Sequence, residues 1–221
     1  MLNFFNQTAF HVFGAATSWA EVIGFVSGGL CVWYTVRQNI WNFPLGLVNA
    51  IFFGILFLNA GLYSDSALQV VYLVLNAFGW FAWLRLGPNS SRLRVGVASR
   101  AQILGALVFV LVFTALDYRL LVHLKDSAPF LDALTTGLSL AAQTLLSFKK
   151  IQNWFFWIAA DLIYIPLYWH RDLVLTSLIY VIFLFMCFRG LWEWKRAQSK
   201  DLIEDAHHGF TVTTKYHLQE I

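Results

Sequence analysis

The chain has 221 residues, of which 59% are hydrophobic and only 12% are charged, with a formal net charge of +3. Soluble domains carry about 25% charged residues, so this composition, with a mean hydropathy of +0.63, excludes an ordinary soluble domain and indicates a polytopic membrane protein. A charge of +3 is too small to indicate binding to nucleic acid.

In chain order, residues 1–17 lack the basic start of a cleavable signal and are expected to lie as a short aromatic segment at the membrane interface. A membrane-spanning helix needs about 20 apolar residues. Seven spans are predicted, at residues 19–36, 41–59, 66–86, 101–116, 129–148, 154–169 and 173–191. The fourth is the most uniformly aliphatic, so we expect it to face lipid or to link the others.

Two parts of the chain resemble each other. The stretch WNFPLGLVNAIFFG from Trp41 aligns with NWFFWIAADLIYIP from Asn153 at a spacing of about 112, which places Asn49 on Asp161. GWFAWLR from Gly79 aligns with GLWEWKR from Gly190 at a spacing of 111. Because the repeat then comprises three spans plus one linking span, both halves enter the membrane in the same direction, and a substrate is expected between them near the midplane.

The predicted fold is therefore an all-α polytopic membrane protein with seven transmembrane helices in a 3+1+3 arrangement of parallel repeats. The expected segments are an N-terminal interfacial segment (1–17), a first three-helix bundle (18–86), a loop with linking helix four (87–127), a second three-helix bundle (128–196) and a polar cytoplasmic tail (197–221). Lys and Arg gather after the odd-numbered spans, so the N-terminus is predicted outside and the C-terminus in the cytoplasm.

Polar and aromatic side chains recur at helical spacing within several spans. Trp154, Trp157, Asp161, Tyr164 and Tyr168 share one face of the sixth span. Any one stripe could simply hold helices together, but stripes on four or five helices predict a shared wet cavity. The candidate substrate-binding residues are Trp41, Asn49, Gln69, Tyr72, Asn76, Thr136, Gln143, Asn153, Trp154, Trp157, Asp161, Tyr164 and Tyr180.

Asp161 is the residue least easily explained by packing, because a carboxylate at the bilayer centre costs at least about 2.5 kcal/mol. It could be protonated, hydrogen-bonded to neighbours or near a cation, and no span carries Lys or Arg near its midpoint. Aromatic faces attract planar and cationic groups, and amides both donate and accept hydrogen bonds. The residues thus predict a small ligand, uncharged or cationic, with an aromatic ring and several hydrogen-bonding groups.

From about residue 18 to 196 the chain resembles the PnuC family of nicotinamide riboside transporters. The most specific features are WxxW followed by an aspartate (Trp154, Trp157, Asp161) and GWxxW (Gly79, Trp80, Trp83). The resemblance implies a fold related to SWEETs and a homotrimer with one path per subunit in the bacterial inner membrane. It implies import of nicotinamide riboside, an NAD precursor, by facilitated diffusion, with trapping by a cytoplasmic riboside kinase.

For that cargo, Trp154 and Trp157 would stack on or gate the base, and Asp161 could compensate the pyridinium charge. The amides of Asn49, Gln69, Asn76 and Gln143 would bind carboxamide and ribose, and Tyr72, Tyr164 and Tyr180 would close the cavity. The alternatives are thiamine or another vitamin on the same fold, a proton-coupled variant, and a membrane receptor or scaffold whose polar stripes only hold its helices together. No GxxxxGK[ST] or GxSxG motif is present, and no histidine lies in a span, so neither an enzyme, a cofactor nor a metal site is expected.

Overall fold

The computed structural model describes residues 7–12, 15–59, 63–87, 93–124, 128–170 and 174–217. Within them the chain forms seven helices, which confirms the predicted all-helical class. They are α2 (Trp19–Val36), α3 (Asn42–Asn59), α4 (Tyr63–Arg85), α5 (Arg100–His123), α6 (Pro129–Ser147), α7 (Asn153–His170) and α8 (Val174–His217). Three stretches in the described residues, Ser66–Arg85, Arg100–His123 and Ser177–Ile203, are long and apolar enough to cross a membrane. Two shorter apolar helices, Val22–Val36 and Asn42–Ile55, accompany them.

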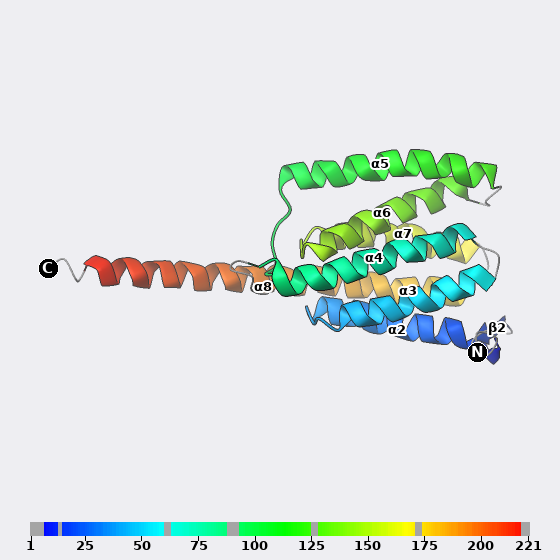
Figure 1. Ribbon diagram of the computed structural model, residues 1–221, viewed down its shortest axis with the longest axis horizontal. Coiled ribbons are helices and arrows are strands. Elements are labelled where there is room, and N and C mark those ends of the chain that lie inside the picture. Colours follow the sequence, from blue (N-terminus) through cyan, green and yellow to red (C-terminus); the bar gives the residue numbers. More distant parts are fainter. Residues whose placement is uncertain are drawn as a thin grey trace.

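Six of the described helices form a ring. Contacts run from α2 to α3, α3 to α4, α4 to α6, α6 to α7, α7 to α8, and from α8 back to α2. The linking helix α5 packs on α6 at the edge of the bundle (Figure 1). Gly137 of α6 permits that approach, since a Cβ there would lie 3.2 Å from the Thr114 hydroxyl of α5. Most of the α5 surface faces outward, as its aliphatic sequence predicts.

The α2–α3 and α6–α7 turns have the same backbone conformation. Gln38 and Lys149 both adopt a positive φ, of 54° and 52°. They are separated by the same interval as the GWFAWLR and GLWEWKR stretches, which we call the repeat interval. The amide of Gln38 donates to the Thr35 carbonyl, and the amide of Lys149 donates to the Leu146 carbonyl, so the acceptors are separated by the repeat interval too. These recurrences support the predicted parallel repeat.

The recurring contacts also correct the alignment of α3 with α7. The hydroxyl of Ser66 donates to the carbonyl of Gly54, and the hydroxyl of Ser177 donates to that of Ile165. The two serines are separated by the repeat interval, and so are the two carbonyl residues that accept from them. The slightly longer spacing predicted for α3 and α7 is therefore wrong by one position. Asn49 therefore corresponds to Ala160 rather than to Asp161. The α3 and α7 sequences share too few identical residues to determine how they align. The hydrogen bonds to the backbone determine that alignment.

Both ends of the chain differ from expectation. Where the sequence predicts an interfacial aromatic segment, β1 (Thr8–Val12) and β2 (Ala15–Ser18) form an antiparallel pair. The last helix does not end near residue 191 but continues to His217, projecting beyond the bundle (Figure 1). The reason is local: residues 191–208 contain no Gly or Pro and are rich in helix formers such as Glu, Lys, Arg and Ala.

Candidate functional site

A row of four aromatic side chains fills the bundle near the end from which α8 projects, which we call the α8 end. We call this row of side chains the tryptophan layer. It consists of Phe43, Trp83, Trp154 and Trp194, each no more than 3% exposed. Neighbouring ring centroids lie 5.0 Å apart for Phe43 and Trp83, 5.8 Å for Trp83 and Trp194, and 5.4 Å for Trp194 and Trp154. The layer thus runs from α3 through α4 and α8 to α7.

Two hydrogen bonds of this layer connect the first three helices with the last three. The Trp83 indole nitrogen donates to the Leu146 carbonyl on α6 at 3.0 Å. The Trp194 indole nitrogen donates to the Thr35 carbonyl on α2, also at 3.0 Å. We call these two bonds the indole clasps. The two donors are separated by the repeat interval, and so are the two acceptors, which makes the clasps equivalent under the predicted repeat.

Glycines let the rings lie directly against the helix backbones. A Cβ at Gly79 would collide with the Phe43 ring, and a Cβ at Gly190 would collide with the Trp154 ring. These two glycines are themselves separated by the repeat interval. The glycines of the GWxxW stretch and of its later counterpart therefore act as sockets for an aromatic side chain of the neighbouring helix.

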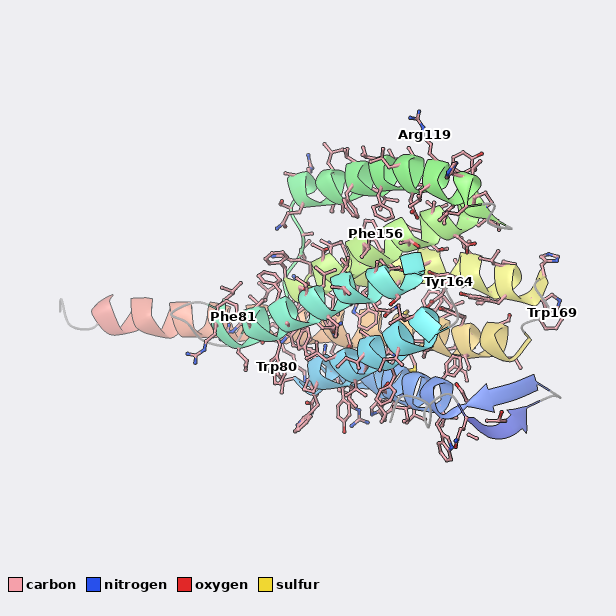
Figure 2. The ribbon with its side chains drawn as sticks, turned by 45° about the vertical axis from the view of Figure 1, so that its right-hand side comes forward. Trp80, Phe81, Arg119, Phe156, Tyr164 and Trp169 are labelled. Atoms are coloured by element: carbon pink, nitrogen blue, oxygen red, sulfur yellow. The ribbon has the colours of Figure 1, made fainter. Side chains whose placement is uncertain are left out.

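A second group, called here the tyrosine layer, consists of Tyr72 on α4, Tyr164 and Tyr168 on α7, and Tyr180 on α8. The Tyr180 ring centroid lies 4.6 Å from that of Tyr164 and 5.3 Å from that of Tyr168. Ser139 of α6 lies close to both Tyr72 and Tyr164. Tyr164 follows Trp154 by about three helical turns, so the two layers are about 15 Å apart along α7. Figure 2 shows Tyr164 within the bundle, whereas Trp169, 57% exposed, lies at the end of α7.

Between the two aromatic layers lies a polar layer of Asn76, Gln143, Asp161 and Cys187, all less than 9% exposed. The Gln143 amide nitrogen donates to the Asn76 side-chain oxygen at 3.4 Å, which joins α6 to α4. The Cys187 thiol donates to Oδ2 of Asp161 at 3.4 Å, which joins α8 to α7. Asn76 lies one helical turn from Tyr72 and two turns from Trp83 on α4. On α7, Asp161 likewise lies one turn from the tyrosine layer and two turns from the tryptophan layer.

The polar layer and the tyrosine layer together contain six of the predicted site residues: Tyr72, Asn76, Gln143, Asp161, Tyr164 and Tyr180. Trp154 lies in the tryptophan layer, where its ring packs against Trp194 and Gly190. Trp157 is half-buried and packs against both hydrophobic core clusters.

The remaining predicted residues lie elsewhere. Asn49 donates to the Gly24 carbonyl at 2.7 Å and holds α3 to α2, while Gln69 packs beside Gly54 of α3. Asn153 donates to the Lys150 carbonyl at the start of α7. Trp41 is 61% exposed and Thr136 is half-buried. Polar spacing alone does not distinguish such helix-joining residues from residues that face the bundle centre.

The predicted site omitted five residues of the layers, Tyr168, Cys187, Phe43, Trp83 and Trp194, and also Ser139, which lies beside the tyrosine layer. Tyr168 and Ser139 were visible in the polar stripes of their helices. Phe43, Trp83 and Trp194 could have been found from the repeat interval, because each matches an aromatic residue in the other half. Within the described residues, no group of His, Cys, Asp or Glu could hold a metal ion.

Layers of aromatic rings around buried amides and a carboxylate, enclosed by a ring of apolar helices, suit a membrane transporter for a small organic molecule. The chain belongs to the family described as "Nicotinamide mononucleotide transporter", whose model matches residues 18–196. The members found are vitamin-type transporters rather than enzymes.

Among its curated relatives, the "Nicotinamide riboside transporter PnuC" of Escherichia coli is 27% identical over 82% of this chain and 87% of the relative. The "Riboflavin/roseoflavin transporter RibM" of Streptomyces davaonensis is 23% identical over 93% of this chain and 99% of the relative. A solved structure, "Crystal structure of the Vitamin B3 transporter PnuC", matches with a TM-score of 0.65 at 23% identity, covering 82% of this chain and 83% of that one. The solved structure establishes the shared fold.

Proposed function

We propose that this protein imports nicotinamide riboside across the bacterial inner membrane by facilitated diffusion, with the polar layer as its binding site. The observation that carries the proposal is the position of Asn76, Gln143 and Asp161, buried between two aromatic layers where the two three-helix halves meet. The names of several relatives support the choice of cargo.

The chemistry of the layers fits a pyridinium riboside. Nicotinamide riboside carries a flat cationic ring, a carboxamide and ribose hydroxyls. The tyrosine layer offers ring faces that attract such a cation, and Asp161 supplies a compensating negative charge. The amides of Asn76 and Gln143 can donate to and accept from the carboxamide or the ribose.

Passage requires the tryptophan layer to open, because its rings fill the bundle at the α8 end. We propose that the two halves rock against each other, breaking and re-forming the indole clasps. The Lys and Arg residues that follow the odd-numbered spans support a cytoplasmic position for this end, with the N-terminus outside. The tryptophan layer would then be the inner gate, which assigns Trp154 to gating rather than to stacking on the base.

Equilibrium binding by calorimetry tests the cargo. The detergent-purified chain is titrated with nicotinamide riboside, thiamine and riboflavin. Saturable binding of the riboside alone supports the proposal. The similarity to a riboflavin/roseoflavin transporter over 93% of this chain makes riboflavin the second candidate. Selective binding of riboflavin would keep the transporter and change its cargo, and binding of none of the three would refute the site.

Uptake into vesicles that contain only this protein tests the coupling. Facilitated diffusion predicts that internal riboside rises to the external concentration and no further. Accumulation above it in a proton gradient would instead favour a proton-coupled transporter with Asp161 as the carrier. We further propose a homotrimer and trapping of the product by a cytoplasmic riboside kinase. Light scattering tests the homotrimer by measuring the protein mass of the oligomer after the bound detergent has been subtracted. Loss of net uptake in cells without the kinase tests the trapping.

A further inference from the structure

A basic cavity of about 280 Å³ opens at the α8 end, between the last turn of α2 and the part of α8 that follows Gly190. It is separate from the three layers described above. Its lining residues are Val36, Arg37, Gln38, Glu193, Arg196, Ala197 and Lys200.

The charges around this cavity are unbalanced. Arg37, Arg196 and Lys200 line it, together with the carboxylate of Glu193. That carboxylate lies 3.8 Å from the Arg189 guanidinium, and Arg189 and Arg37 both lie over the ring of Trp33, at 5.6 Å and 4.5 Å. Three cationic side chains against one carboxylate give the cavity lining a net positive charge, so an anion in the cavity would be bound favourably.

In the other half of the bundle, the chain itself covers the corresponding place. After α4 the backbone returns across the α6–α7 turn: the amide of Leu93 donates to the Trp83 carbonyl, and the amide of Gly96 donates to the Lys149 carbonyl. The Lys149 ammonium is satisfied there by the Leu93 carbonyl at 3.0 Å. Beside Gln38, the counterpart of Lys149 in the first half, α8 continues as a helix, and no described segment returns across the turn. Backbone carbonyls therefore occupy this place at the α6–α7 turn. At the α2–α3 turn the same place is open and can accept a group from outside the chain.

Exposed aromatic rings indicate the depth of the cavity in the membrane. The Arg196 guanidinium lies 5.5 Å over the ring of Trp192, which is 58% exposed, and Trp41 beside the α2–α3 turn is 61% exposed. Tryptophan at such positions marks the headgroup region of a bilayer. A basic pocket between helices at this level suits an anionic headgroup.

We propose that this cavity binds the phosphate of an anionic phospholipid. Arg37 follows α2, while Arg196 and Lys200 belong to α8, so the headgroup bridges the two halves. It lies beside the indole clasp between Trp194 and Thr35, and it holds that clasp closed. The proposal concerns a site outside the transport path and does not depend on which vitamin is carried.

The test uses the full chain in a neutral detergent with phosphatidylglycerol, phosphatidylcholine or inorganic phosphate added. Thermal unfolding and native mass spectrometry report stability and bound lipid. We expect phosphatidylglycerol to raise the Tm by about 3 °C, and phosphatidylcholine and inorganic phosphate to raise it much less. The double variant R196Q/K200Q should bind phosphatidylglycerol about 25-fold more weakly, at about fivefold per lost charge.

K195Q is the matched control. Lys195 is adjacent in sequence and exposed, but its ammonium lies over Phe155, 5.9 Å away, and does not line the cavity. Because the substituted side chains lie at the surface of α8 beyond the tryptophan layer, both variants should fold. Equal lipid binding by R196Q/K200Q and K195Q would overturn the site. Equal stabilisation by phosphatidylcholine or by inorganic phosphate would overturn the anionic lipid as its occupant.

Discussion

At the residue scale, Asp161 has the most demanding environment. It is 3% exposed, its hydrogen-bond partner is the weakly donating Cys187 thiol, and α7 contains no Lys or Arg. A carboxylate so placed is stabilised poorly by the protein alone and well by a cationic ligand. The sequence could identify this residue because a charge within an apolar stretch is conspicuous. It could not identify the partner, which comes from a different helix 26 residues away.

The Asp161→Asn variant tests the charge pairing. Asn keeps the size and a hydrogen-bonding group but removes the charge, so the affinity for nicotinamide riboside should fall about 10- to 100-fold. Calorimetry measures the affinity, and thermal unfolding confirms that the variant is folded. Cys187→Ser, which retains a donor to Asp161, should bind nearly normally. If Asp161→Asn binds as tightly as the parent, the carboxylate has no role in recognising the cation.

Gly46 of α3 controls the position of the Asn76 amide, because a Cβ at Gly46 would collide with the Asn76 side-chain oxygen. Gly46→Ala should therefore displace Asn76 from Gln143 and weaken ligand binding about tenfold, the value of a lost hydrogen bond or more. Gly29→Ala is the control, since a Cβ at Gly29 meets nothing within 4 Å. That variant should bind normally and gain up to about 1 kcal/mol of helix stability. Equal affinities in the two variants would contradict a role for Asn76.

At the scale of elements, the helix positions followed from apolar length. The spans predicted at residues 19–36, 129–148 and 154–169 agree with α2, α6 and α7 to within a residue or two. The sequence could not predict which helices contact one another through their polar faces. Asn49 and Asp161 look alike in their apolar surroundings, but one holds α3 to α2 and the other lies in the polar layer. Apolar length fixes where a helix lies along the chain, whereas its rotation depends on side chains from distant segments.

The indole clasps allow a test at this scale. Trp194→Phe keeps most of the ring but removes the donor to the Thr35 carbonyl, a loss of about 1 kcal/mol. The layer should then open about five times more often. Cys187, 4% exposed and packed against this layer, reports the opening through its rate of maleimide labelling in a Cys31→Ser background.

The control for this experiment is Trp192→Phe, close to Trp194 on α8 but 58% exposed. It should label at the parental rate. Trp83→Phe, which removes the other clasp, should label as fast as Trp194→Phe. Unchanged labelling in both clasp variants would mean that the clasps do not limit opening at the α8 end.

At the scale of the whole molecule, α8 is far longer than a bilayer requires. Its 44 residues extend about 66 Å, about twice the thickness of the hydrocarbon core. Within the described residues, the hydrogen bonds that join α8 to other helices, from Ser177 to Trp194, lie in its first half. The family match likewise ends at residue 196. We therefore expect the layers to form without the second half of the helix.

Truncation after Ile203 should leave the Tm within about 2 °C of the parent and ligand affinity unchanged, because ordinary surface losses are within about 0.5 kcal/mol. Thermal unfolding and calorimetry of the truncated chain measure both, with light scattering to follow the oligomer. Loss of binding would show that the distal helix supports the site. A smaller oligomer with intact binding would assign it to assembly instead.

The indole clasps have a consequence for how such a chain can arise. Each half gives the other the same hydrogen bond that it receives, which is the pattern of an isologous contact between two identical subunits. Two separate three-helix polypeptides inserted in the same orientation could associate through these bonds. Once both copies are fused into one gene, the odd number of helices would invert the second copy. We propose that α5, which packs on α6 at the edge of the bundle, restores the orientation of the second half without entering the interface between the two.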